Sequence, residues 1–196
     1  MEPNENSILF DLDETLFSMK STMLRRINKK YNGLHQFEQV PITQHMFNRN
    51  GLLAMSYTLN SIIQPRLYCD QCIYPQVFRL IKKLIDSEFD VWFVTMPQSS
   101  HHRQHSIEEK RAQIQRYFGT KASEKIIFKE RKYEVAGKYL IDDNINLLKD
   151  EHQARWKAII MKQPHTRDVK CERSITPENC VEKFFCIFNR DQKTFV

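Results

Sequence analysis

The chain has 196 residues, of which 41% are hydrophobic and 28% charged, a composition typical of a globular protein with a sizeable core. Lys and Arg outnumber Asp and Glu by 30 to 24, and the whole excess lies in residues 100–196, which carry 20 basic and 14 acidic groups. The four glycines (Gly33, Gly51, Gly119 and Gly137) are spaced too widely for a Gly-rich phosphate loop or a dinucleotide-binding fingerprint.

The lack of a recognisable signal peptide or membrane segment, together with the cysteine content, favours a cytoplasmic location. The first seven residues are polar and acidic, unlike a signal peptide, and no apolar run approaches the roughly 18 residues that a membrane helix needs. Five cysteines, an odd number without an export signal, favour reduced thiols. Cys69-x-x-Cys72 has the spacing of a zinc or redox pair, but no second pair with ligand spacing follows. We therefore expect a cytoplasmic protein that is neither a membrane nor a zinc protein.

Short apolar runs alternate with helical stretches along most of the chain. Apolar residues at helical spacing predict helices over 75–87 and 107–118. Unbroken runs, typical of strands buried on both faces of a parallel sheet, predict strands at 7–10, 91–94, 126–128, 139–141 and 158–161. This alternation predicts an α/β fold with a Rossmann-like, doubly wound parallel sheet. The last stretch, 170–196, is expected to pack on it as a terminal helix or strand.

Residues 17–74 interrupt the alternation and fit an insertion. A basic helical stretch over 20–31 is followed by mixed apolar and polar residues in which no strand of the sheet is evident. A length of 196 residues also exceeds one domain of about 150 residues. We expect a small helical cap, 17–74, inserted after the first strand and lying over the strand ends. The α/β catalytic core would then comprise residues 1–16 and 75–196.

Polar or charged residues follow four of the predicted strands. Because ligands of open α/β sheets bind at the carboxyl ends of the strands, these residues are expected to meet in one site. Asp11-Leu12-Asp13-Glu14-Thr15 alone could be an acidic helix start, and Thr95 alone a helix cap. Their occurrence together favours catalysis. In chain order the set is Asp11 and Asp13, then Thr95, then Lys129 or Lys132, then Asp142 and Asp143.

This set resembles the four motifs of the haloacid dehalogenase superfamily of phosphohydrolases. These motifs are Asp-x-Asp-x-Thr/Val, a strand-end Thr or Ser, a Lys, and an acidic pair. The register of the resemblance selects Lys132 rather than Lys129 as the third motif. Residues 67–166 are most similar to the 5'(3')-deoxyribonucleotidases. The similarity is carried by Val91–Pro97, His101-His102, Glu109-Lys110, Ile126-Ile127, Lys132, Leu140–Asp143, Trp156 and His165.

The resemblance implies a phosphatase that hydrolyses (deoxy)nucleoside monophosphates through an aspartyl-phosphate intermediate. Asp11 would be the nucleophile, and Asp13 the general acid and base. Mg²⁺ prefers oxygen ligands and would be held by the Asp11 carboxylate, the Asp13 carbonyl and Asp143, with Asp142 bracing the site.

The same resemblance implies which groups bind the phosphate. The Thr95 hydroxyl, the backbone N–H of Met96 and the charge of Lys132 would contact its oxygens. Lys132 could otherwise be a solvated surface lysine. Lys110 could also reach the phosphate from its helix, or form a surface salt bridge near Glu109; the sequence leaves both open.

The chain departs from the nucleotidase pattern around the site. Glu14-Thr15 stands where that family has Gly-Val, so Glu14 is expected to place a negative charge near the phosphate. Met96 replaces a Ser, and Met19 replaces a Phe of the aromatic cage that holds the base. The stretch His101–His105 resembles a chelating site but fits a solvated helix start better.

Three functional hypotheses follow. The first is a nucleotidase, and the second is a phosphatase with the same chemistry acting on a sugar phosphate or a phosphoprotein, because the cap determines the substrate. The third is a non-catalytic module that binds phosphate or nucleic acid, which the basic second half would suit. We expect a small phosphomonoester as the substrate, no membrane or nucleic acid partner, and leave a homodimer open.

Overall fold

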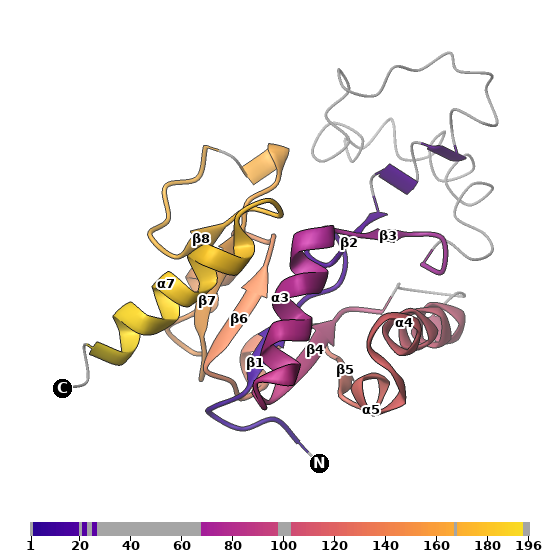
Figure 1. Ribbon diagram of the computed structural model, residues 1–196, viewed down its shortest axis with the longest axis horizontal. Coiled ribbons are helices and arrows are strands. Elements are labelled where there is room, and N and C mark those ends of the chain that lie inside the picture. The colour runs from indigo at the N-terminus through magenta and orange to yellow at the C-terminus, as the bar shows by residue number, and fades with distance from the viewer. Residues whose placement is uncertain are drawn as a thin grey trace.

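Six short strands build the central sheet of the computed structural model, which describes residues 2–19, 21–22, 25–26, 68–97, 103–166 (the side chain of His165 excepted) and 168–193. The strands are β1 (Ile8–Phe10), β4 (Val91–Thr95), β5 (Ile126–Phe128), β6 (Tyr139–Asp142), β7 (Lys157–Met161) and β8 (Ser174–Ile175). They lie in the order β5-β4-β1-β6-β7-β8, and every neighbouring pair is parallel (Figure 1). The predicted parallel sheet is confirmed.

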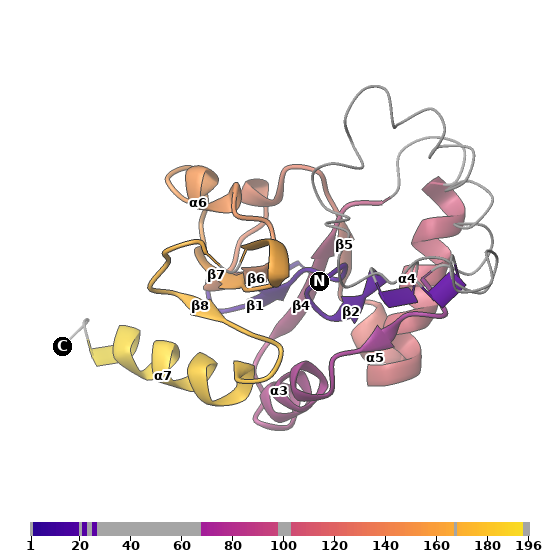
Figure 2. The same cartoon turned by 90° about the horizontal axis from the view of Figure 1, so that it is seen from above.

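Helices cover both faces of this sheet (Figure 2). They are α3 (Pro75–Asp86), α4 (Arg103–Phe118), α5 (Thr120–Ser123), α6 (Leu147–Asp150) and α7 (Cys180–Lys193), with 3₁₀ turns η3 (Lys132–Glu134) and η4 (Pro164–Thr166). In Figure 2, α3 and α7 lie on one side of the strands and α6 on the other, while α4 and α5 flank the β5 end. Among the described residues, no helix combines the length and the apolar character that spanning a membrane would require.

Side chains alternate along each strand between two cores. Ile8 and Phe10 of β1 pack in the larger cluster, with Phe93, Ile141 and the apolar faces of α3 and α7. Leu9 points to the opposite face, into a smaller cluster around Trp156. Because both faces are covered, the strands need apolar residues at every position, which explains their unbroken apolar runs.

The predicted elements agree with the structure to within a few residues. The helix expected over 75–87 is α3, which begins at a proline suited to a first helical turn. The helix expected over 107–118 begins earlier, at Arg103. The terminal stretch forms both a short strand, β8, and the helix α7, which packs on α3.

A second, two-stranded sheet joins the two ends of the segment predicted as a cap. β2 (Phe17–Ser18) and β3 (Cys72–Ile73) pair antiparallel, with Phe17 opposite Ile73. This ribbon was not predicted, because strands of two residues leave no periodic pattern in a sequence. Most of the predicted cap, 27–67, lies outside the described residues, so the division into cap and core stays a prediction.

One stabilising carboxylate gives a testable pH dependence. Asp90, just before β4, accepts hydrogen bonds from Ser7 Oγ at 2.5 Å, Trp92 Nε1 at 2.8 Å and Lys125 Nζ at 2.7 Å. Burial opposes the charge of Asp90, but these hydrogen bonds outweigh it and lower the pKa of the carboxyl group. The ionised form therefore contributes stability above the unfolded-state pKa of about 4, which is lost as the pH falls through the lower folded-state pKa.

We expect Asp90→Asn to reduce the free energy of unfolding at pH 7 by about 1.5 kcal/mol, as for a hydrogen-bonded charge. Urea titrations at several pH values should show the difference from the wild type shrinking below about pH 4. Asp86→Asn changes an exposed carboxylate that pairs with Lys82, and it serves as the control. A deficit independent of pH would contradict the assignment.

Candidate active site

The candidate site lies where the chain crosses from one side of β1 to the other. Phe10, the last residue of β1, pairs with Phe93 of β4 and with Ile141 of β6. The residues that follow these three strands therefore meet at one edge of the sheet, at a topological switch point. The backbone N–H of Asp11 donates to the carbonyl of Ile141 at 2.9 Å, which continues the ladder up to the site.

Three carboxylates converge at this edge. Asp11, Asp142 and Asp143 each have an oxygen within 4.8 Å of one another, and Asp11 and Asp142 are buried. A hydrogen bond also connects the acidic pair to the turn after β1: the backbone N–H of Asp143 donates to the Thr15 hydroxyl at 3.1 Å. Clustered carboxylate oxygens are the ligands that Mg²⁺ prefers, so this donor set fits the ion.

Lys132 holds the acidic cluster together. Its Nζ lies 2.5 Å from Asp11 Oδ1 and 2.6 Å from Asp142 Oδ2, and its side chain is 12% exposed. Burial disfavours the charge of Lys132, but the two carboxylates outweigh it and raise its pKa above the usual range. Lys129 instead pairs with Glu134 and is 46% exposed. The structure thus brings Lys132, and not Lys129, to the predicted site.

The clustered carboxylates repel one another, and this repulsion shifts the pKa of Asp142. Burial raises the pKa of Asp142 to about 7, with Asp11 and Asp143 acting in the same direction and Lys132 in the opposite one. Like charges in a buried site make it costly to ionise every carboxylate at once. A divalent cation in the cluster would relieve this repulsion, which is a second feature that fits Mg²⁺.

Lys110 is wholly buried and belongs to the same site. From α4 its Nζ lies 2.6 Å from Asp13 Oδ2, 2.9 Å from Thr95 Oγ1 and 2.9 Å from the Met96 carbonyl oxygen. The alternative of a surface salt bridge is therefore wrong. Lys110 Nζ also lies over the ring of Tyr68, 4.8 Å from its centroid.

Asp13 pairs with Lys110 and is more exposed than Asp11. Its side chain is 27% exposed, although its Oδ1 is buried and has no hydrogen-bond partner among the described residues. Burial and the neighbouring Asp11 raise the pKa of Asp13, while Lys110 and Lys132 act against them. A carboxyl group with a raised pKa can carry a proton closer to neutral pH, as a general acid needs.

The turn after Asp13 is held in an unusual conformation. Glu14 has φ 57°, in the left-handed region, which costs a residue with a side chain about 1 kcal/mol. Its N–H donates to Phe17 O at 2.8 Å, and its carbonyl accepts from Gln163 Nε2 at 2.5 Å. Its carboxylate accepts from the Tyr74 hydroxyl at 3.3 Å. This conformation explains why glycine suits the position in similar nucleotidases.

The Glu14 carboxylate also has a partner at the start of α3, and its expected effect on the phosphate stays a prediction. Its carboxylate contacts Tyr74, the residue before α3, and burial together with Glu14 raises the pKa of that tyrosine to about 12.

Trp156 and Glu109 were singled out in the sequence only by the resemblance, and the structure shows which groups they contact. Trp156 Nε1 donates to the Lys132 carbonyl at 3.0 Å, and the Glu109 carboxylate accepts from the Tyr68 N–H at 2.9 Å. His105 Nε2 lies 2.7 Å from Glu109 Oε1, so this histidine contacts a carboxylate. His101, His102 and the side chain of His165 lie outside the described residues.

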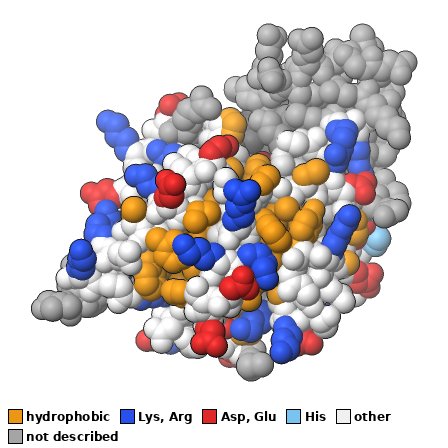
Figure 3. Space-filling model, in the orientation of Figure 1, with side chains coloured by type: hydrophobic (Ala, Val, Ile, Leu, Met, Phe, Trp, Pro, Cys, Tyr) orange, Lys and Arg blue, Asp and Glu red, His pale blue; other side chains and the backbone are white. Residues whose placement is uncertain are grey.

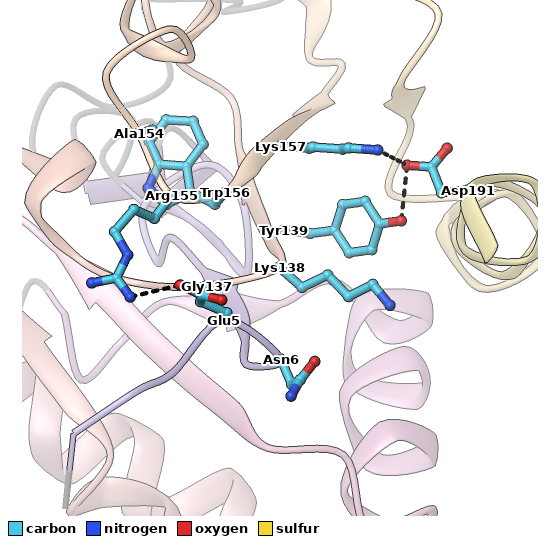
Figure 4. Close-up of a pocket in the computed structure, with 10 residues that line it drawn as sticks. All are labelled: Glu5, Asn6, Gly137, Lys138, Tyr139, Ala154, Arg155, Trp156, Lys157 and Asp191. Atoms are coloured by element: carbon cyan, nitrogen blue, oxygen red, sulfur yellow. Dashed lines mark hydrogen bonds and ion pairs between the residues drawn. The ribbon is translucent and has the colours of Figure 1, made fainter. Parts of the chain in front are cut away.

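A separate hollow of about 540 Å³ lies at the other end of the strands (Figure 4). Four of its charged side chains form two pairs: Lys157 Nζ is 3.1 Å from Asp191, and Arg155 is 2.8 Å from Glu5. Lys138 Nζ instead lies over the ring of Phe188. None of the predicted site residues lines it. Its position at the amino ends of β6 and β7 separates it from the acidic cluster at their carboxyl ends.

The excess positive charge is dispersed on the face that Figure 3 shows. Lys and Arg side chains there are interspersed with Asp and Glu, and the described side chains of this face form no continuous basic band. Nucleic acid sites are typically basic patches or stripes on one face.

Comparison with known proteins gave two kinds of match. The family described as 5' nucleotidase, deoxy (pyrimidine), cytosolic type C protein (NT5C) matches residues 5–184. No curated protein matched.

Solved structures match over nearly the whole chain. A haloacid dehalogenase-like hydrolase from Streptococcus pneumoniae is 11% identical with a TM-score of 0.58, covering 91% of this chain and 98% of that one. A protein described as a predicted phosphatase from Clostridium acetobutylicum is 11% identical with a TM-score of 0.56, and the match covers 93% of this chain and 99% of that one. The HAD-hydrolase YfnB from Bacillus subtilis, solved with magnesium, is 16% identical with a TM-score of 0.54, and the match covers 95% of this chain and 99% of that one. At these identities the structures show a shared fold, and the family match goes further: the chain belongs to the NT5C family of 5'-nucleotidases, within the haloacid dehalogenase superfamily of phosphohydrolases.

Proposed function

We propose that the chain is a Mg²⁺-dependent phosphatase that hydrolyses (deoxy)nucleoside monophosphates to nucleoside and phosphate. The observation that carries the proposal is the convergence of Asp11, Asp13 and two buried lysines beside an acidic pair at one sheet edge. Hydrolysis of phosphate monoesters is very slow without catalysis, so such a site must neutralise charge and hold a nucleophile in line.

Asp11 is the proposed nucleophile. One of its carboxylate oxygens attacks phosphorus and forms an aspartyl-phosphate while the bond to the ester oxygen breaks. Asp13 gives its proton to the departing oxygen, which leaves as the hydroxyl of the nucleoside. Asp13 then takes a proton from water, which attacks the aspartyl-phosphate and releases inorganic phosphate and free Asp11.

The acidic cluster would hold the metal ion. The proposed ligands are the Asp11 carboxylate, the Asp13 carbonyl and Asp143, while Asp142 holds Lys132 in place. When bound, Mg²⁺ would neutralise charge on the phosphate oxygens and reduce their repulsion with Asp11. The magnesium bound to YfnB supports this, because that protein shares the fold.

Four groups would bind the phosphate. The Thr95 hydroxyl and the Met96 N–H donate to its oxygens, and Lys110 and Lys132 supply two positive charges. Both lysines already lie within hydrogen-bond distance of a carboxylate, so their ammonium groups are fixed before substrate arrives. Such prearranged charge is the main source of transition-state stabilisation in phosphoryl transfer.

The family match supports a nucleotide as the substrate, since its description names deoxynucleotides with a pyrimidine base and a cytosolic type. A cytoplasmic location is proposed on the same ground, and a homodimer stays a prediction. The segment that would contact the base, the predicted cap, is where the sequence departs from the nucleotidase pattern. A phosphatase acting on a sugar phosphate or a phosphoprotein is therefore the alternative outcome of the test below.

The test is a phosphate-release screen over nucleoside monophosphates, sugar phosphates and phosphopeptides. With Mg²⁺ we expect turnover of pyrimidine deoxynucleotides such as dUMP and dTMP, and EDTA should reduce it by at least 100-fold, because metal charge stabilisation is worth several kcal/mol. Restored Mg²⁺ should return the activity. Turnover of phosphopeptides alone would refute the nucleotidase, and DNA binding without any turnover would favour a non-catalytic module.

A further inference from the structure

The loop after β7 contacts the turn that carries Asp13, although the two are about 150 residues apart. Gln163 is 7% exposed, and its Nε2 donates to the Glu14 carbonyl at 2.5 Å. Gln163 is itself fixed, because its backbone N–H donates to the Thr166 hydroxyl at 2.8 Å. A buried amide from a distant loop thus contacts the turn that carries Asp13.

The left-handed backbone of Glu14 needs such support. A residue with a side chain persists there only where its surroundings determine the conformation. The N–H, carbonyl and carboxylate of Glu14 are bound by Phe17, Gln163 and Tyr74 respectively. Of these three contacts, the one at the carbonyl determines the rotation of the peptide that follows Glu14. If Glu14 relaxed to φ below zero, the peptide between Asp13 and Glu14 would rotate, and the Asp13 carbonyl with it.

We propose that Gln163 is a positioning residue: its amide holds the left-handed Glu14 turn and thereby orients the side chain and carbonyl of Asp13. The inference rests on the proposed function for its effect on catalysis, but not for its effect on the turn. Loss of a supporting hydrogen bond of this kind typically lowers activity or metal affinity by 10- to 100-fold.

Gln163→Leu removes the donor while keeping a similar size. We expect its kcat for the best substrate of the screen to fall by about 10- to 100-fold with KM changed less than threefold, and its Mg²⁺ affinity by calorimetry to fall about tenfold or more. Hydrogen exchange measured by mass spectrometry should be faster at the amide of Glu14, which is bonded to Phe17. Gln153→Leu, in an exposed loop where Gln153 Nε2 lies 3.0 Å from His152 Nε2, is the matched control.

A double variant tests the route through Glu14. Glycine adopts the left-handed region without strain. Adding Glu14→Gly to the Gln163→Leu variant should therefore recover at least a third of the decrease in log kcat that Gln163→Leu causes. A double variant no better than Gln163→Leu would overturn the proposal, as would a Gln163→Leu protein equal to the control in exchange. If the wild type hydrolyses none of the nucleotides, the proposed function fails, yet the exchange measurement still decides the role of Gln163.

Discussion

Asp11→Asn should reduce phosphate release by about 10⁴-fold or more, because it removes the atom that attacks phosphorus. Asparagine keeps the shape of the side chain, and Lys132 keeps its partner Asp142 at 2.6 Å. We therefore expect the thermal midpoint to stay within about 3 °C of the wild type, a change of roughly 1 kcal/mol. Initial rates with dUMP or dTMP at saturating Mg²⁺ measure the effect, together with thermal unfolding by circular dichroism.

The control for this variant is Asp86→Asn, which neutralises an exposed carboxylate on α3 at the same net charge. Its rate should match the wild type. Acid quenching during turnover should trap labelled phosphate on the wild type and not on Asp11→Asn. A variant that keeps more than about a tenth of the wild-type rate would rule out Asp11 as the nucleophile.

The positions of the catalytic groups could be predicted because they follow strands. The runs that end at Phe10, Val94 and Ile141 are apolar without interruption, which only a sheet covered on both faces requires. Once the strands are parallel, their carboxyl ends must meet, so Asp11, Thr95 and Asp142 could be grouped without coordinates.

The role of Lys110 could not be decided in the same way. Helix α4 buries Ser106, Glu109, Lys110, Gln113 and Ile114, so its inward face is mostly polar. A sequence pattern identifies a buried face by its apolar residues, and on this criterion the buried side of α4 resembles a solvated one. Burial of Lys110 depends instead on partners from distant segments, Asp13 and Thr95, which no local pattern contains.

Backbone geometry at the site was likewise invisible in the sequence. Glutamate rarely adopts the left-handed region, so Glu14 suggested a charge rather than a turn. The contact from Gln163 joins segments 149 residues apart. Substrate choice remains a proposal for a related reason: the cap would determine it, and residues 27–67 of the cap lie outside the described part of the chain.

Lys110→Met is expected to cost both stability and catalysis. The variant leaves Asp13 without its 2.6 Å ion pair beside Asp11, and breaking a buried pair costs about 3 to 5 kcal/mol. Because Asp13 is 27% exposed, water offsets part of this cost, and we expect a loss of about 2 kcal/mol in the free energy of unfolding. Activity should fall by about 10³-fold, since one of the two positive charges that face the phosphate is lost.

The loss of stability should also depend on pH in a direction that follows from Asp13. Without Lys110, the remaining effects of burial and Asp11 raise the pKa of Asp13 further above its unfolded value. A carboxyl group whose folded pKa is raised destabilises the folded state as the pH rises through that range, so the deficit of Lys110→Met should be largest near pH 8 and shrink toward pH 5. Lys82→Met, at an exposed ion pair with Asp86, is the matched control and should behave as the wild type in both assays. Urea titrations at pH 5 and pH 8 decide the matter: a Lys110→Met protein as stable as Lys82→Met at both values would mean that Lys110 does not neutralise Asp13, and its place in the site would have to be abandoned.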